Sequence, residues 1–376
     1  MIYLDYSATT PVNTEVLDSF DKVNLDYIGN ANSLHKLGRE SYHLMEASVK
    51  QVADLLNVKQ EEVIFTSGAS EANNLAIMGT ILKYKNRGNH ILTTKLEHSS
   101  VMDTMSFLEK NGYIVEYINI LPDGKIDIED LEKKIKDETM LVSICEVNSE
   151  IGIIQDVNNI GKILKKYPKI VFHVDGTQAV GKKQINLDSI DLYSFSAHKI
   201  YGLKGVGVLI KKKNIELVPI IHGGKSQTIY RSGTPSLPLY VSCAKALKLI
   251  LKDLDENYEY IKKLNIKLRS NLETMKEIHI NSNLDCIPHI LNFSIKNIKP
   301  ETLINALSEE NIYISTKTAC SKSDISDSVF ELTQNYDLAT HSVRVSLSHL
   351  TTEEEIDKFF NVLKEKIEEL SFKKGE

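Results

Sequence analysis

The sequence has few cysteines, and no apolar run is long enough to cross a membrane. Its four cysteines, Cys145, Cys243, Cys286 and Cys320, match neither a disulfide framework nor the spacing of a metal site, which favours a reducing compartment. A membrane span needs about 20 consecutive apolar residues, and the N-terminus lacks the basic, apolar and small-residue order of a signal segment. We therefore expect a cytoplasmic protein without membrane contacts.

Positive charge is also not in excess. The formal net charge is -6 and the pI is near 6.0, so the chain has no general attraction to nucleic acid or anionic lipid. Of its 376 residues, 42% are hydrophobic and 26% are charged, which is enough apolar material for a large core. There are no internal repeats and no low-complexity linker. These features indicate an ordinary globular protein that does not bind nucleic acid directly.

Short β-rich runs alternate with helical patterns between about residues 60 and 210. The runs are 63–65, 91–92, 113–118, 141–145, 170–174, 192–195 and 206–210. This alternation predicts an α/β fold with a mostly parallel seven-stranded sheet covered by helices. In such a sheet, ligands bind at the carboxyl ends of the strands and in the loops that follow.

A second, smaller α/β unit is predicted beyond a long helical pattern over residues 236–272. Its expected strands are 289–295, 312–315 and 343–347, and alternation in the last strand places Arg344 on a polar face. A capped amphipathic helix follows Thr352. We predict a large domain over residues 15–255 and a small domain formed by 1–14 and 256–376.

The segment Phe65–Glu71 runs from an apolar strand through a glycine turn into a helical pattern. Free amides at a helix start, together with the Ser70 hydroxyl, are suited to binding a phosphate group. A plain turn with a serine cap explains the same residues. The segment matches neither the dinucleotide fingerprint nor the P-loop, so by itself it favours the plain turn.

Two charged residues follow other buried strands. Asp175 ends the apolar run 170–174, where its carboxylate either pairs with a cation such as a protonated pyridine or caps the next helix. Lys199 follows the run 192–195 and either forms an imine in a partly desolvated crevice or lies on the surface. A phosphate site, a carboxylate and an amine in this order together indicate one pyridoxal-phosphate site.

These segments resemble the signature segments of the cysteine desulfurases of the NifS and IscS type. The resemblance extends in order over essentially the whole chain. The matching segments are 3–11, 66–71, 97–98, 148–152, 173–178, 196–199, 231–234 and 344–347. It implies a pyridoxal-phosphate-dependent transferase of fold type I that acts on L-cysteine.

The resemblance implies roles for individual residues. Lys199 would carry the cofactor as an imine and move protons, Asp175 would hold the pyridine nitrogen, and His98 would stack on the ring. Further cofactor-binding residues would be Ala69 and, at the ring hydroxyl or phosphate, Gln178, Asn148, Ser70, Ser196 and His198. Thr234 would reach the phosphate from the other subunit of a homodimer, and Asn30 and Arg344 would hold the substrate carboxylate.

Cys320 is the expected sulfur acceptor, because it lies in the polar stretch 315–324 where the family carries a reactive cysteine loop. Lys317 and Lys322 favour its thiolate. Cys145 and Cys243 lie in apolar segments typical of core packing. The implied reaction leaves L-alanine and a persulfide on Cys320, whose sulfur passes to an iron-sulfur scaffold or a tRNA-thiolation enzyme.

Other functions fit the same scaffold. An aminotransferase or a selenocysteine lyase uses the same cofactor site, and a catalytically silent homologue would serve only as a binding partner. The sequence also departs from the family pattern, since Gly176 stands where alanine is frequent. The joint presence of Lys199, Asp175, His98, Cys320 and Arg344 favours the desulfurase.

Overall fold

The computed structural model describes residues 1–316 and 325–372. Its main feature is a seven-stranded sheet in the order β2-β8-β7-β6-β5-β3-β4, in which β8 alone runs antiparallel to its neighbours. The strands are β2 (Val63–Thr66), β3 (His90–Thr93), β4 (Ile114–Tyr117), β5 (Thr139–Cys145), β6 (Val171–Asp175), β7 (Leu192–Ser196) and β8 (Gly207–Lys211). The predicted fold class, with a mostly parallel seven-stranded sheet, is confirmed.

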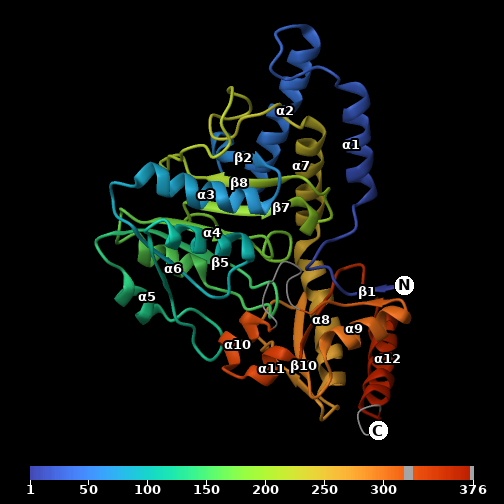
Figure 1. Cartoon of the computed structure of the whole chain (residues 1–376). Helices are drawn as coiled ribbons and strands as arrows, with labels where there is room; N and C mark the ends of the chain where they lie inside the picture. The colour runs from blue at the N-terminus through green and yellow to red at the C-terminus, as the bar shows by residue number, and fades with distance from the viewer. Residues whose placement is uncertain (317–324, 373–376) are drawn as a thin grey trace.

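Helices cover both faces of this sheet, as Figure 1 shows. Strand residues alternate between two apolar clusters, with Phe65 and Val142 on one face and Ile64 and Leu141 on the other. The first face packs against α2 (Lys36–Leu55), α6 (Val157–Leu164) and α7 (Leu237–Lys252), with α1 (Thr14–Asp26) beside α7. The second packs against α3 (Ala69–Tyr84) and α4 (Ser99–Lys110). Helix α5 (Ile128–Lys134) contributes Leu131 to the cluster of the first face.

The predicted helix over 236–272 is two helices in the structure. Helix α7 ends at Lys252 and α8 (Leu254–Leu272) begins directly afterwards. Asp253 between them has φ -114° and ψ 27°, outside the helical range. Aspartate is a poor residue for a helix interior, which is consistent with a break at this position. In Figure 1 the two helices run one after the other from the large sheet to the smaller sheets.

The smaller sheets are built by the C-terminal part of the chain together with the first residues. Strands β9 (Ile278–Ile280), β10 (Ile290–Ile295) and β12 (Ser342–Ser346) form an antiparallel sheet. The predicted strand at 312–315 begins as β11 (Ile312–Tyr313), which pairs with β1 (Ile2–Tyr3). Ser315 then exchanges two backbone hydrogen bonds with Arg344 of β12. The remaining helices are α9 (Pro300–Glu309), α10 (Asp327–Thr333), α11 (Tyr336–Thr340) and α12 (Glu353–Phe372).

Helix α12 begins as its sequence predicts. The Thr352 hydroxyl accepts the backbone N–H of Glu355 at 3.2 Å, and the Glu355 carboxylate accepts the N–H of Thr352 at 3.1 Å. Its apolar face packs on α8, α9 and β10 around Phe359 and Phe293. Among the described residues, no helix has the length and apolar character that crossing a membrane requires.

Candidate active site

A cavity of about 580 Å³ lies at the carboxyl ends of the strands of the large sheet. Its walls come from the loops after β2, β6 and β7, from residues 7–9 near the N-terminus, and from β12. The predicted site residues that line it are Ala69, Ser70, His98, Asp175, Gln178, Ser196, His198, Lys199 and Arg344. Parallel strands bring these distant segments to one edge.

The phosphate-binding segment is the turn between β2 and α3. Ala69 and Ser70 are the first residues of this helix, so their backbone N–H groups have no carbonyl one turn earlier in the helix. Strand β8 passes close behind the turn, and a Cβ atom on Gly207 would lie 2.6 Å from the carbonyl carbon of Gly68. A glycine at 207 is therefore needed for this approach. The helix start supplies amides and a positive dipole end to an anion.

Two further phosphate-site candidates line the cavity from the end of β7. Ser196 is buried, and the Nδ1 atom of His198 lies 3.2 Å from the Thr9 hydroxyl. Burial and the charge of Lys199 lower the pKa of His198 to about 4. The imidazole is therefore neutral near pH 7 and retains one N–H donor for an anionic ligand.

Asp175 ends β6, and its side chain is only 5% exposed. One carboxylate oxygen accepts a hydrogen bond from Nδ2 of Asn73 at 2.8 Å, and the other accepts one from the backbone N–H of Thr177 at 3.0 Å. Asp175 does not cap a helix, since residues 177–180 form a turn, and it makes no ion pair with any described residue. A buried carboxylate of this kind fits a protonated ring nitrogen as its cationic partner.

His98 lies at the start of α4 with its ring at the cavity. Its Nδ1 atom accepts the backbone N–H of Ser100 at 3.1 Å and lies 2.9 Å from the Ser100 hydroxyl. Burial is the main cause that lowers the pKa of His98, so the ring is neutral near pH 7. A neutral imidazole fixed at one edge is suited to lie against a flat aromatic ligand.

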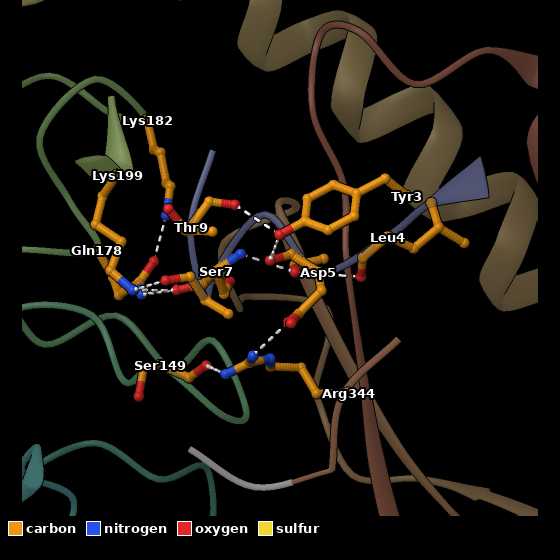
Figure 2. A network of polar contacts seen from close by, with 12 residues as sticks. Tyr3, Leu4, Asp5, Ser7, Thr9, Ser149, Gln178, Lys182, Lys199 and Arg344 are labelled. Carbon is orange, nitrogen blue, oxygen red and sulfur yellow. Dashed lines mark hydrogen bonds and ion pairs between the residues drawn. The ribbon is translucent and has the colours of Figure 1, made fainter. Parts of the chain in front are cut away.

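Lys199 follows β7 in a short 3-10 turn, and its amine is held by the N-terminal segment. Nζ donates to the carbonyl oxygens of Ser7 and Ala8, both at 2.6 Å. Figure 2 shows Lys199 next to Ser7. Gln178 donates through Nε2 to the Ser7 carbonyl at 2.9 Å, and its Oε1 accepts a hydrogen bond from the buried Lys182. A helix start, a buried carboxylate and a lysine amine fit the phosphate, ring nitrogen and aldehyde carbon of pyridoxal phosphate.

Arg344 reaches the cavity from β12 and is only 2% exposed. Alternation predicted a polar face for it, and the structure shows that this face is turned into the protein. Its Nη2 atom lies 2.7 Å from a carboxylate oxygen of Asp5, and Nη1 donates to the Ser149 carbonyl at 2.9 Å. A buried guanidinium at a cavity wall is suited to binding a carboxylate.

Three predicted site residues among those that the structure describes do not line the cavity. Asn30 and Thr234 are exposed, and neither lines it. The amide of Asn148 is used within its own loop and neighbourhood, because Oδ1 accepts two backbone N–H groups while Nδ2 donates to the Leu96 carbonyl and the Ser328 hydroxyl. Cys320 lies outside the described residues.

Residues that the sequence left without a role also shape the site. Asp5 and the carbonyls of Ser7 and Ala8 contact the two cations, and Lys182 contacts Gln178. The motif at 3–11 marks this segment, but nothing local indicates that it reaches Lys199 and Arg344, 192 and 339 positions away. Cys145 is buried as predicted, and it also lines the cavity, where its thiol donates to the Leu96 carbonyl at 3.4 Å.

The departure at Gly176 has a physical cause in the structure. A Cβ atom at this position would lie 1.9 Å from Cζ of Tyr193. The Tyr193 hydroxyl donates to the buried Glu146 carboxylate at 2.6 Å, which fixes the ring in place. Glycine therefore leaves room for a tyrosine that alanine would displace.

The family model for aminotransferase class-V matches residues 2–359. The chain is 42% identical over 383 residues to cysteine desulfurase IscS of Buchnera aphidicola subsp. Baizongia pistaciae, covering 98% of this chain and 93% of that protein. A NifS-like protein of known structure superposes with a TM-score of 0.92 at 35% identity over 99% of both chains.

A structure of SspA in complex with cysteine is also similar, with a TM-score of 0.82 and 30% identity. The match covers 94% of this chain and 100% of that one. Full-length similarity at these identities confirms the family that the motifs predicted. The chain belongs to the aminotransferase class-V family and, within it, to the cysteine desulfurases of the NifS and IscS type.

Proposed function

We propose that this protein is a pyridoxal-phosphate-dependent cysteine desulfurase that converts L-cysteine to L-alanine and passes the sulfur to Cys320. The observation that carries the proposal is one cavity lined by the Lys199 amine, the Asp175 carboxylate and the Arg344 guanidinium. Bound pyridoxal phosphate would withdraw electrons from the substrate α-carbon. The family relationship supports both the cofactor and the reaction class.

The protein's own residues have separate tasks in this reaction. Lys199 holds the cofactor and later exchanges a proton at the substrate α-carbon. The Asp175 carboxylate keeps the ring nitrogen protonated, which the burial of Asp175 and its lack of an ion pair among the described residues support. Arg344 binds the substrate carboxylate, and His98 fixes the ring plane.

Cys320 takes the sulfur atom in the proposed reaction. Its thiolate attacks the substrate sulfur, the carbon-sulfur bond breaks, and the carbon fragment is protonated and leaves as L-alanine. The three described cysteines are poor alternatives, because burial raises the pKa of Cys243 and Cys286 to about 12 and that of Cys145 well above its usual value. Protonated buried thiols are weak nucleophiles.

The proposal includes a homodimer and a sulfur acceptor. Thr234 and Asn30 are exposed and outside the cavity of their own chain, which fits a contribution to the site of a second copy. The acceptor would be an iron-sulfur scaffold or a tRNA-thiolation enzyme that meets Cys320 in the cytoplasm. The net charge of -6 supports a protein acceptor more than direct binding to RNA.

The decisive experiment is Cys320→Ala, with Cys286→Ala as the matched control. After treatment with L-cysteine, mass spectrometry of the wild type and the control should find the persulfide on Cys320. Cys320→Ala should keep the visible absorption of the cofactor and lose alanine production by roughly 100-fold or more, because no thiolate accepts the sulfur. A persulfide on another cysteine, or near-normal alanine release, would refute the assignment. Alanine formation that requires a keto acid would indicate an aminotransferase.

A further inference from the structure

The N-terminal residues 3–9 lie between the two cations of the site and contact both. Lys199 donates to the carbonyls of Ser7 and Ala8, and Arg344 pairs with Asp5, as Figure 2 shows. Both contacts join residues far apart in sequence. The segment is therefore part of the cavity wall and links the lysine to the arginine.

Asp5 is held firmly in place by its neighbours. The Tyr3 hydroxyl donates to the carbonyls of Asp5 at 3.1 Å and Thr9 at 2.9 Å, which closes the loop between them. On the preceding residue, the Leu4 carbonyl accepts the backbone N–H of Ser346 at 2.7 Å. Burial, with the nearby charge of Asp5, raises the pKa of Tyr3 to about 12, so its hydroxyl keeps the proton that these bonds need.

The plane of the Arg344 guanidinium is fixed by contacts from two different segments. Asp5 contacts Nη2 at 2.7 Å, and the Ser149 carbonyl accepts from Nη1 at 2.9 Å. The Nε–H group is buried and has no acceptor among the described residues, although the side chain lines the cavity. Because a guanidinium carries five N–H donors in one plane, these two contacts leave donors for a further anion.

We propose that Asp5 is a positioning residue for the substrate carboxylate, which acts by holding the Arg344 guanidinium in the orientation that this carboxylate needs. The proposal rests on the proposed function, because it assumes that an amino acid binds in the cavity. The charge of Asp5 also compensates the buried guanidinium before the substrate arrives. Without Asp5, the guanidinium would turn toward other acceptors, and its fork geometry would be lost.

The test compares two ligands that differ by one carboxylate. L-alanine and ethylamine are titrated into the pyridoxal-phosphate-loaded protein, and the change in visible absorption gives a dissociation constant for each. Asp5→Ala should raise the dissociation constant of L-alanine by about tenfold or more and leave that of ethylamine unchanged. Asp5→Asn should raise the dissociation constant of L-alanine less, since the amide oxygen of asparagine still accepts a hydrogen bond from Nη2 of Arg344. Asp21→Ala, at an exposed position on α1, is the matched control and should change neither constant.

Two further measurements separate positioning from a structural defect. For L-cysteine, Asp5→Ala should raise KM while kcat stays within about threefold, because the reacting atoms are not touched. Tyr3→Phe should raise KM by a few fold, since it loosens the loop that carries Asp5 without removing a charge. If Asp5→Ala does not fold, Tyr3→Phe still tests the positioning role of Asp5.

The outcomes that overturn the proposal are specific. If Asp5→Ala weakens the binding of L-alanine and of ethylamine equally, the cavity is damaged in general and the carboxylate is not the cause. Tighter binding of L-alanine by Asp5→Ala would show that Asp5 competes with the substrate. If the absorption of the wild-type protein responds to neither amine, the proposed function itself is contradicted. A wild type that binds both amines leaves the proposed function intact, so the two failures can be told apart.

Discussion

The two halves of the cavity are built in different ways. In the half expected to hold the cofactor, Asp175 ends one strand of the seven-stranded sheet, while Ser70 and Lys199 come just after two others. In the half expected to hold the carboxylate, Arg344 comes from a separate sheet and is oriented by Asp5, 339 positions earlier. The first half therefore follows from the order of strands in one sheet, whereas the second depends on packing between the two ends of the chain.

The largest expected effect is in the cofactor half. Lys199→Ala should remove the visible absorption of the bound cofactor and reduce desulfurase activity by roughly 1,000-fold or more, because the nucleophilic amine is lost. Lys204→Ala is the control, since Lys204 also lines the cavity but does not follow a sheet strand directly, and its variant should keep the absorption. If Lys199→Ala keeps the visible absorption of the wild type, Lys199 is not the residue that holds the cofactor.

The same division explains what the sequence could predict. The seven-stranded sheet and the segments of the cofactor half were predicted because each motif is contiguous and directly follows an apolar strand. Arg344 was predicted as a site residue, but its burial was not, because alternation along a strand does not say what packs on its polar face. The pairing of β1 with β11 and the contact of Asp5 with Arg344 were not predicted, since they join distant segments.

Other differences have local causes. The break at Asp253 was missed because the apolar pattern continues through it, and a single poor helix former is weak evidence in a long helix. The cavity-facing position of Cys145 was missed because a strand that is buried on both faces has no polar alternation to separate cavity from core.

A smaller effect is expected at Lys182, which lies on the link between the two halves through Gln178. Burial, followed by the charges of Lys199 and Arg344, lowers the pKa of Lys182 from 10.5 to about 7. Between these values the unfolded chain binds more protons than the folded one, so wild-type stability rises with pH. Methionine does not titrate, so the stability advantage of Lys182→Met should be largest at and below pH 7 and shrink toward pH 10.

The measurement is urea unfolding of Lys182→Met and the wild type at several pH values, with the exposed Lys162→Met as control. Each pKa unit corresponds to about 1.4 kcal/mol, so the difference between the two proteins should change by a few kcal/mol over this window. The variant should also hold the cofactor several-fold less tightly, because Gln178 loses a donor. A difference that stays constant with pH would show that Lys182 is not neutral in the folded protein.

A comparable effect with the opposite dependence on pH is expected at Glu97. Burial raises the pKa of this carboxyl group from 4.5 to about 8, although its Oε1 atom accepts from the Thr94 hydroxyl at 2.7 Å and the Cys145 N–H at 2.9 Å. Its stabilising contribution is fully present below pH 4.5 and is lost as pH rises through 8, because the unfolded chain ionises first.

Glutamine keeps the accepting oxygen of Glu97 and cannot ionise, so Glu97→Gln should remove this loss. Relative to the wild type, the variant should gain stability as pH rises from 5 to 8, by about 1.4 kcal/mol for each unit of pKa shift. At pH 5 the variant should be as stable as the wild type or slightly less stable. The glutamine NH2 group takes the place of Oε2, which has no hydrogen-bond partner among the described residues. Urea unfolding at each pH, with the exposed Glu109→Gln as control, measures the difference. A gain that instead grows toward low pH would mean that Glu97 is ionised in the folded protein, and that the buried region around Thr94 and Cys145 carries a charge.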